Sequence, residues 1–291
     1  MFKRSLICTD LSDSLDRLVR FVPHLAAGGL HQLVFVHSVP LWEEGQIPRV
    51  DEQRIEAGKA RLSEALDEVP EGVEVKLEVP SGRPIDTIPE LVARYRSEVI
   101  FTGTPIRSLL QEKVVGSTTL ELAKRTLTPI AILRPQLIAT YTCEELALRC
   151  QHLWRYLLIP YNGGESAKYL LDRIKESARS RPDNSLAKCM LLWVVDDGRK
   201  KVPREYRLEQ ATQELESAKA ELEALGLEVE TEVRLGNFFI ELVKVAEQFD
   251  ISAIAIAHAA RSALLNWTAP SSANEVLRRS WFPVLFFSPQ Q

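Results

Sequence analysis

Two short segments of the sequence carry polar residues whose spacing could bind a ligand. The first runs from Cys8 to Ser12, after an apolar run, and holds the carboxylate of Asp10, which could accept hydrogen bonds from an amine edge or a ribose hydroxyl. The second pairs Thr102-Gly103 with Gly116-Ser117-Thr118, directly before a helical pattern. A glycine and two hydroxyls at a helix N-terminus favour phosphate, because free N–H groups and the helix dipole attract anions. Together the segments indicate anion-binding chemistry.

Both segments also have a purely structural interpretation. Asp10 could cap the N-terminus of the helix that follows it. Ser117 or Thr118 could cap the next helix, with Glu121 completing a capping box. For this second segment the two interpretations are compatible, since a cap can support a bound phosphate. Arg107, between the two halves of the segment, could reach the same anion or be a solvated surface arginine.

The rest of the sequence gives no catalytic or metal-binding pattern. The histidines are scattered without H-x-x-x-H spacing, and neither a G-x-S-x-G elbow nor a G-x-x-x-x-G-K-[ST] loop is present. Cysteines stand at positions 8, 143, 150 and 189 without a C-x-x-C pair, so we expect reduced thiols and no zinc or disulfide framework. We therefore expect no catalytic residue, no metal ligand and no enzyme.

Charge and hydropathy exclude two classes of partner. The chain has 291 residues, of which 36 are basic and 40 acidic, for a net charge of −4. Nucleic-acid binding rests on a surplus of Lys and Arg, which is missing here. No stretch approaches the roughly 18 apolar residues that cross a bilayer, and the apolar run after Met1 is too short for a signal peptide. We expect a cytoplasmic protein with no nucleic-acid or membrane partner.

The elements that must position these segments occur twice in the chain. The stretch from Leu6 to Ser14 parallels that from Leu158 to Ser166, an offset of 152 residues (158 minus 6). Later matches keep an offset of 154: Gly72–Val75 with Gly226–Val229, Gly82 with Gly236, Arg107-Ser108 with Arg261-Ser262, and Pro129–Ile132 with Pro283–Phe286. Ordered blocks of this kind indicate a tandem repeat.

Each copy alternates short apolar runs with helical patterns. The runs are Leu33–Val36, Val99–Phe101, Ile130–Leu133, Met190–Val195, Ala253–Ile256 and Val284–Phe287. Continuous runs suit strands buried on both faces of a parallel sheet, so we expect two doubly wound α/β domains, each with five strands and about four helices. One apolar stripe, from Leu208 to Leu225, fits either a coiled coil or a helix lying on a sheet, and we favour the sheet.

On these residues the chain resembles the universal stress protein family along nearly its whole length, once in each copy. The family's nucleotide pattern is Gly, two residues, Gly, nine residues, then Gly-Ser or Gly-Thr, and Gly103 and Gly116-Ser117 fall at its places. Asp10, His37 and Pro129 match the family's first-strand Asp, second-strand His and last-strand Pro. The resemblance implies strand order 3-2-1-4-5 and an adenine nucleotide (ATP, AMP or a cyclic dinucleotide), with or without Mg²⁺. It assigns the contacts to Thr9, Asp10, Ser38, Thr102, Gly103, Gly116, Ser117 and Thr118.

The departures from the pattern distinguish the two copies. The pattern's second glycine is Ile106 here, and a β-branched side chain resists φ > 0 and crowds a phosphate. In the second copy the three glycine positions are Ala257, Ala260 and Pro270, and the first-strand acid is Asn162. We expect a partly retained nucleotide site in the first copy and a degenerate one in the second.

The repeat also predicts domain limits and assembly. The expected domains are residues 1–136 and 154–291, joined by a connector at 137–153. By the resemblance, the fifth strands, Pro129 to Leu133 and Pro283 to Phe287, lie at sheet edges, and an apolar edge strand invites pairing. We expect the two to pair within the chain in a pseudo-two-fold arrangement. The chain would then be an intramolecular pseudo-dimer, with or without a further homodimer.

From the resemblance we expect a cytoplasmic, stress-associated regulatory protein that binds an adenine nucleotide in its first domain and acts on an unidentified protein partner. Two alternatives stay open. In one, both sites have decayed and the chain is a scaffold or dimerisation protein; bound nucleotide on the purified protein would exclude it. In the other, it is a slow ATP-hydrolysing or adenylating enzyme, which would need pyrophosphate-loop glycines that the stretch from Asp10 to Ser14 lacks.

Replacing Ile106 with glycine tests the first-copy pattern. We expect Ile106→Gly to tighten triphosphate binding more than monophosphate binding, by about 1 kcal/mol, because it relieves crowding at the phosphates and leaves the adenine contacts unchanged. Calorimetric titration with ATP and AMP measures both affinities. An equal response of the two ligands, or none, would place Ile106 away from the phosphates.

Overall fold

The computed structural model describes residues 1–12, 14–41, 49–104, 117–196, 198, 202–257 and 272–288. The chain divides into two compact units. The first unit is Phe2–Gln151, and the second unit is His152–Gln291 together with Met1. No helix in the described ranges is long and apolar enough to cross a membrane.

The first unit is built on a five-stranded parallel sheet. Its strands are β1 (Arg4–Cys8), β2 (Gln32–Val36), β3 (Glu74–Glu78), β4 (Val99–Gly103) and β5 (Ile130–Leu133). Their order is β3-β2-β1-β4-β5, and every pair is parallel. Residues 33–36 of β2 are at most 1% exposed, as expected for a strand covered on both faces. The predicted strand order is confirmed.

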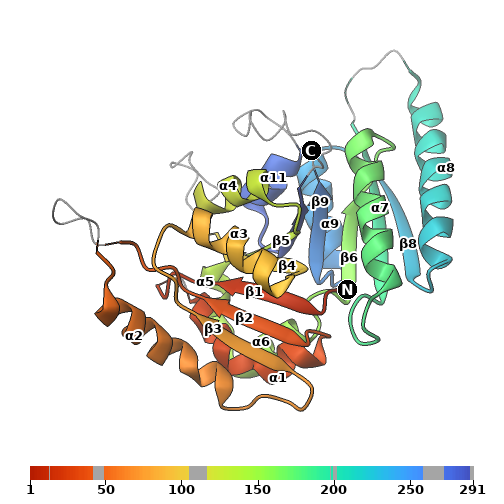
Figure 1. The fold of residues 1–291 in the computed structure, drawn as a ribbon. Coiled ribbons are helices and arrows are strands. Elements are labelled where there is room, and N and C mark those ends of the chain that lie inside the picture. The colour runs from red at the N-terminus through yellow and green to blue at the C-terminus, as the bar shows by residue number, and fades with distance from the viewer. Residues whose placement is uncertain are drawn as a thin grey trace. The chain divides into compact units, whose positions relative to one another are not determined.

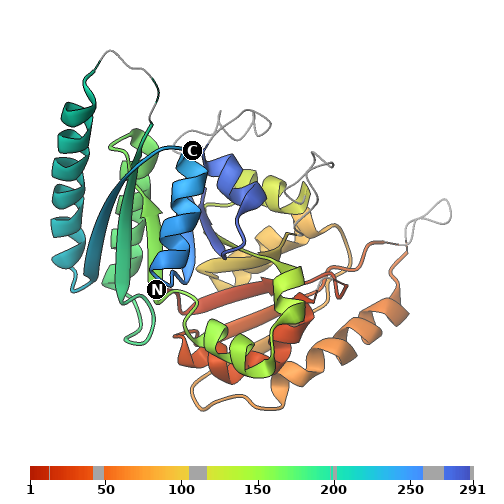
Figure 2. The same cartoon turned by 180° about the vertical axis from the view of Figure 1, so that it is seen from behind.

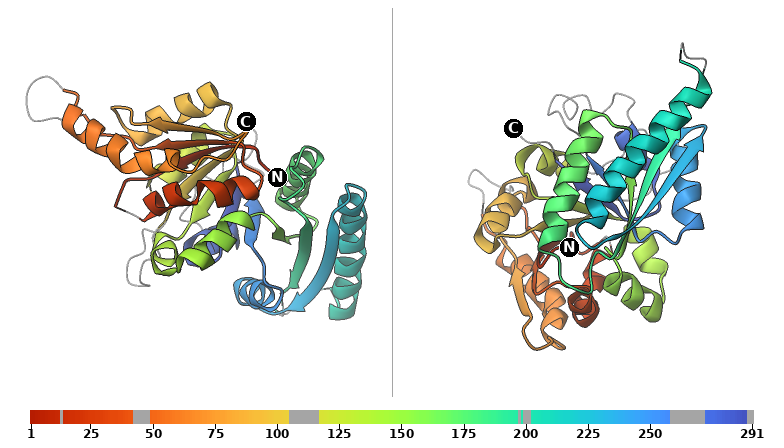
Figure 3. Two further views of the ribbon diagram at one scale, coloured as in Figure 1. Left: turned by 90° about the horizontal axis from the view of Figure 1, so that it is seen from below. Right: turned by 90° about the vertical axis from the view of Figure 1, so that its right-hand side faces the viewer.

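Helices cover both faces of this sheet (Figure 1). The helical elements are η1 (Leu15–Phe21), α1 (Val22–Ala27), α2 (Glu52–Leu62), η2 (Ser63–Leu66), α3 (Pro84–Tyr95) and α4 (Ser117–Arg125). The helices α3 and α4 pack together on one face, while α1 and α2 lie on the other (Figure 3). This division follows from right-handed crossovers that leave β1 in one direction and reach β4 and β5 in the other.

The segment expected to be a connector is helical and packs on the first unit. It forms α5 (Pro135–Thr140) and α6 (Cys143–Gln151), and α6 lies against α1 (Figure 2). The approach is close at Gly28, where a methyl group would lie 2.8 Å from the Gln151 carbonyl oxygen. A glycine is required there because any side chain would collide with backbone. Arg17 reaches the same segment by donating to the carbonyls of Ile138 and Tyr141.

The second unit repeats the first. Its strands are β6 (Tyr156–Pro160), β7 (Lys188–Val195), β8 (Glu228–Leu235), β9 (Ala253–Ala257) and β10 (Val284–Phe287), in the order β8-β7-β6-β9-β10 with parallel pairing. Its described helices are α7 (Glu165–Arg179), α8 (Arg204–Glu223), α9 (Phe238–Gln248) and α11 (Ser272–Arg279). The arrangement of the two units, and with it the expected pairing of the fifth strands, stays a prediction.

The apolar stripe of α8 lies on the sheet. The helix lies against β7 and β8 (Figure 3). Four residues of its stripe, Ala211, Leu215, Ala218 and Leu222, are at most 1% exposed. The coiled-coil alternative for this helix is therefore wrong, because the stripe is already covered by the second unit's own strands.

The repeat extends to backbone dihedral angles. Gly82 and Gly236 have φ of 136° and 133°, although they are 154 residues apart (236 minus 82). At the same spacing, Arg96 and Asp250 have φ of 49° and 51°. Both are non-glycine residues with a left-handed backbone conformation. Arg96 lies after the end of α3, and Asp250 lies after the end of α9. Side chains there cost free energy that a glycine would avoid.

Arg96→Gly and Asp250→Gly should each stabilise the protein by about 0.5–1 kcal/mol, because glycine adopts the left-handed region without a Cβ clash. Equilibrium urea unfolding of the full chain measures the change. Arg96→Ala and Asp250→Ala are matched controls that remove the side chain and keep the Cβ. If alanine and glycine stabilise equally, the gain comes from the lost side chain and not from backbone strain.

Candidate functional site

The strand order of the first unit reverses between β1 and β4. In an open parallel sheet, ligands bind at such a reversal, outside the carboxyl ends of the strands. Cys8 pairs with Val36, and Ile7 pairs with Phe101. The residues that follow these pairs, Thr9, His37 and Thr102, therefore reach the same edge of the sheet.

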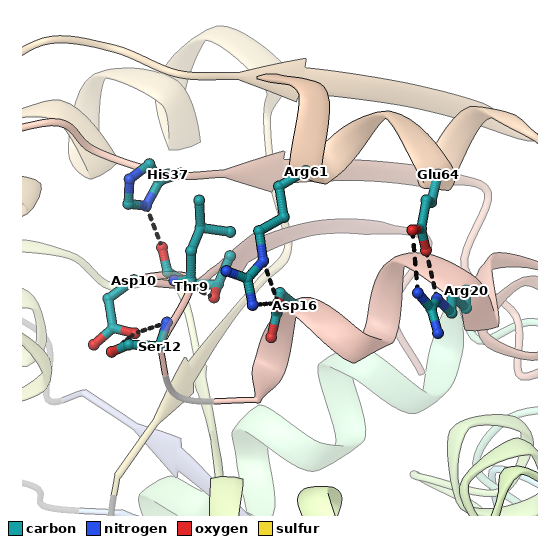
Figure 4. Close-up of polar contacts among 9 residues, drawn as sticks. Thr9, Asp10, Ser12, Asp16, Arg20, His37, Arg61 and Glu64 are labelled. Carbon is teal, nitrogen blue, oxygen red and sulfur yellow. Dashed lines mark hydrogen bonds and ion pairs between the residues drawn. The ribbon is translucent and has the colours of Figure 1, made fainter. Parts of the chain in front are cut away.

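A hydrogen bond ties the ends of β1 and β2 together. The Thr9 N–H donates to the Val36 carbonyl at 3.0 Å, and His37 Nδ1 lies 3.1 Å from the Thr9 carbonyl oxygen, to which it donates (Figure 4). The His37 ring packs against α2, where a methyl group at Gly58 would lie 3.1 Å from its Cδ2 atom. The contact fixes the ring, so His37 holds the backbone of the β1 end.

Asp10 closes a turn directly after β1. Its Oδ1 atom accepts hydrogen bonds from the Ser12 N–H and the Ser12 hydroxyl, both at 2.8 Å (Figure 4). This is an Asx turn, in which the carboxylate bonds to the backbone two residues on. The expectation that Asp10 caps the next helix is wrong: the N-cap position of η1 is Ser14, and no side chain bonds there. The Asp10 side chain lies at the exposed rim of the edge.

The predicted hydroxyls link the strand ends to the helices above them. Ser38 Oγ lies 2.8 Å from Thr87 Oγ1 on α3, and Thr119 Oγ1 on α4 donates to Thr102 Oγ1 at 3.3 Å. Thr9 and Thr102 are 7% and 5% exposed. A hydroxyl has one hydrogen and two lone pairs, so the Ser38 and Thr102 hydroxyls can each make a further hydrogen bond beyond these contacts.

The first turn of α4 is the remaining part of the predicted site. The helix begins at Ser117, and Thr118 is half-buried in its first turn. Glu121, expected in a capping box, accepts a hydrogen bond from Lys124 at 2.7 Å, and this bond holds the pKa of the Glu121 carboxyl below its usual range. The predicted Arg107 and Gly116, the departure at Ile106 and the side chain of Ser117 lie outside the described residues.

Two residues at this edge were missed by sequence reasoning. Thr104 directly follows β4 and continues its ladder, since its N–H donates to the Leu133 carbonyl at 3.0 Å. Arg134 directly follows β5 and donates from a guanidinium nitrogen to the Thr104 carbonyl at 3.2 Å. Thr104 is fully buried and Arg134 is 3% exposed, and this burial lowers the pKa of Arg134 to about 10. Only their positions at strand ends could have drawn attention to them.

Ion pairs hold η1, the helix that follows the Asp10 turn. Arg61 of α2 donates to Asp16 of η1 at 2.9 Å, and Arg20 of η1 pairs with Glu64 of η2 (Figure 4). The Asp16 side chain is 15% exposed, so this pair is partly shielded from solvent. These pairs fix η1, and therefore the loop between β1 and η1, relative to α2.

The same edge of the second unit carries different side chains. The Tyr161 N–H donates to the Leu192 carbonyl at 2.9 Å, as Thr9 does to Val36, so Tyr161 and Trp193 stand where Thr9 and His37 stand in the first unit. Their rings form a T-shaped pair with centroids 6.2 Å apart. The polar pair of the first unit is thus replaced by packed aromatic rings.

The turn after β6 keeps the geometry of the Asp10 turn. Asn162 Oδ1 accepts from the Gly164 N–H at 3.1 Å, and Gly163 has a φ of 69° where Leu11 has 61°. Among the described residues, no group of three or more His, Cys, Asp or Glu side chains is placed to hold a metal ion.

Comparison with known proteins fixes the family. The family model described as "Universal stress protein family" matches residues 1–134 and 154–288. The chain belongs to the universal stress protein family. It carries the family's domain twice, as the sequence repeat predicted.

Solved universal stress proteins have the same fold over nearly the whole chain. A universal stress protein from Archaeoglobus fulgidus DSM 4304 is 17% identical and aligns over 98% of both chains with a TM-score of 0.66. A putative universal stress protein from Pseudomonas aeruginosa UCBPP-PA14 is 16% identical and aligns over 99% of this chain and 94% of its own, with a TM-score of 0.59. A search of curated proteins finds no match.

The turn at Asp10 can be separated from any ligand contact of its carboxylate. Asp10→Asn should leave stability within about 0.3 kcal/mol of the starting protein, because an amide oxygen closes the same turn at Asn162. Asp10→Ala should lose about 0.5–1 kcal/mol, the usual value of such a hydrogen bond. Urea unfolding measures both. Equal losses for asparagine and alanine would show that the negative charge, and not the turn, is what stabilises the fold.

Proposed function

We propose that this universal stress protein is a stress-associated regulator that binds an adenine nucleotide at the carboxyl edge of its first sheet. The observation that carries the proposal is the register of β1, β2 and β4. It gathers Thr9, Asp10, Ser38, Thr102 and Gly103 at the one edge where strand order reverses. A carboxylate and several hydroxyls at such a reversal suit the amine edge and ribose of a nucleoside.

The phosphates would bind at the start of α4. The first-turn N–H groups of Ser117 and Thr118, the helix dipole and the Gly103 backbone would contact them, together with Gly116 and Arg107, which precede the helix in the sequence. Mg²⁺ would either accompany the phosphates or be absent. The second unit would not bind a nucleotide, because Tyr161 and Trp193 fill the equivalent edge. In addition, β9 ends at Ala257, where the corresponding strand of the first unit, β4, ends at Gly103.

The proposed mechanism is binding without turnover. A nucleotide that binds only the folded first unit stabilises it by mass action and so changes its availability to a protein partner. We place this activity in the cytoplasm and assign no catalytic residue.

A scaffold function without nucleotide is the second candidate. One observation favours it: the hydroxyls of Ser38 and Thr102 have protein partners, Thr87 and Thr119. A scaffold would keep these bonds as helix–strand links. The two candidates differ in whether the purified chain carries or binds nucleotide, which absorbance at 260 nm and chromatography of a denatured extract reveal.

Calorimetric titration with ATP, AMP and cyclic dinucleotides should give no more than one bound nucleotide per chain. Asp10→Asn should weaken binding about tenfold, because it removes a charged acceptor worth about 1.5 kcal/mol while the turn is preserved. Asn162→Asp is the matched control in the second unit and should change neither affinity nor stoichiometry. Two equivalent sites per chain, or a single site that responds only at Asn162, would contradict the proposed asymmetry.

A further inference from the structure

We propose that Thr104 and Arg134 form a buried anion-binding site, here called the cradle, that binds the phosphates of the nucleotide. The inference rests on the proposed function and adds to it two residues and a basis for specificity. Both residues directly follow strands of the first unit, β4 and β5, so they lie at its carboxyl edge. The cradle would make the affinity of the first unit depend on how many phosphate charges the ligand carries.

The Thr104 hydroxyl is placed to meet a ligand beside α4. Side chains two residues apart on a strand share a face, so Thr104 points to the same face as Thr102, whose Oγ1 atom accepts from Thr119 in the first turn of α4. Thr104 is fully buried, and its Oγ1 atom has no hydrogen-bond partner among the described residues. An unsatisfied buried hydroxyl costs about 1–3 kcal/mol in a protein, so its retention calls for a partner.

Arg134 supplies the charge. Its guanidinium donates to the Thr104 carbonyl at 3.2 Å, which places a cation beside the end of β4. Arg134 is 3% exposed, and burial lowers its pKa to about 10, which leaves it charged at neutral pH. A desolvated guanidinium attracts a phosphoryl oxygen more strongly than a hydrated one, because the surrounding dielectric screens the attraction less.

The second unit lacks this charge at the equivalent place. The residue that directly follows β10 is Ser288, which is 1% exposed and neutral. The first unit therefore has both the charge at this edge and more of the predicted nucleotide-binding residues, and the second unit has neither. A charge at this position of the first unit and none at the equivalent position of the second is the pattern expected if a phosphate binds only in the first unit.

The test compares ligands that share a nucleoside and differ in charge. ATP, AMP and adenosine are titrated calorimetrically into the full chain and into Arg134→Gln and Thr104→Val. Arg134→Gln should weaken ATP binding about tenfold or more and adenosine binding less than about twofold, the difference expected for a lost charged hydrogen bond. Arg125→Gln is the charge-matched control, because Arg125 lies at the far end of α4, where it pairs with Asp86 at 3.0 Å.

Thr104→Val gives a signature that a merely structural hydroxyl would not. Valine keeps the volume and removes the unsatisfied group, so the ligand-free chain should melt at the same or a higher temperature while ATP binding weakens about tenfold. Ser97→Ala is the matched control: Ser97 also has a buried hydroxyl without a partner among the described residues, but it precedes β4 and lies at the opposite edge of the sheet. Its replacement should leave ATP affinity unchanged.

Four outcomes would overturn the cradle. The first is an equal loss of ATP and adenosine affinity in Arg134→Gln, and the second is unchanged ATP affinity in Thr104→Val. If Arg134→Gln does not fold, Thr104→Val alone decides. The third is a starting protein that binds none of the three ligands, which also removes the proposed function. In the fourth, the starting protein binds ATP, and both variants keep its ratio of ATP to adenosine affinity. That result overturns the cradle and leaves the proposed function standing.

Discussion

The hydrogen bond from the Thr9 N–H to the Val36 carbonyl, 3.0 Å long, sets where β1 ends relative to β2. Parallel pairing of Ile7 with Phe101 then brings the end of β4 to the same level on the other side of β1. The crossovers leave β1 toward β2 and reach β4 from the opposite face, so the edge at Thr9 is where the chain's direction across the sheet reverses. The turn at Asp10, the His37 contact and the position of Thr104 all depend on this register, since a shift of one residue would turn each side chain to the other face.

The two units have the same backbone arrangement at the carboxyl edge of the sheet and differ in the side chains that lie there. The bond from Tyr161 to Leu192 repeats that from Thr9 to Val36, and the turn after each first strand is closed by an Asp or Asn oxygen. On that shared frame the first unit presents a histidine and hydroxyls, whereas the second packs Tyr161 against Trp193. Packed rings bury apolar surface and need no ligand, while polar groups at a buried edge are stable only when each finds a partner. The second unit therefore covers this edge with its own aromatic side chains, whereas the first unit has polar groups there.

The sequence predicted what depends on local composition and on the repeat. Continuous apolar runs gave the strands, because parallel strands are buried on both faces, and the matched glycines gave positions with the same φ in both units, as at Gly82 and Gly236. The stripe of α8 was assigned to the sheet because a helix that lies on a sheet needs one apolar stripe, and α8 does contact β7 and β8. The N-cap interpretation of Asp10 was wrong, because an Asp before a helix serves equally as an N-cap or in an Asx turn, and only the backbone path decides. Thr104 and Arg134 could not be found, since nothing in their local sequence distinguishes a buried arginine from a solvated one.

The turn after the first strand of each unit differs in backbone strain as well as in side chains. Leu11 and Gly163 stand at the same point of the turn with φ of 61° and 69°, but only the leucine has a Cβ that resists this conformation. Ser14, in the same loop, has a φ of 67°. Two strained non-glycine residues within one short loop cost about 1–3 kcal/mol each, and they persist only where the surroundings hold them. Here the surroundings are the Asp10 turn on one side and, on the other, η1, which Asp16 and Arg61 fix to α2. A glycine at position 11 would relieve the strain, as the second unit does at Gly163, so the leucine is retained against a stability cost. Strain of this kind concentrates at ligand-binding loops. At this turn the first unit has a strained leucine where the second has a glycine, which agrees with the proposal that only the first unit binds a ligand there.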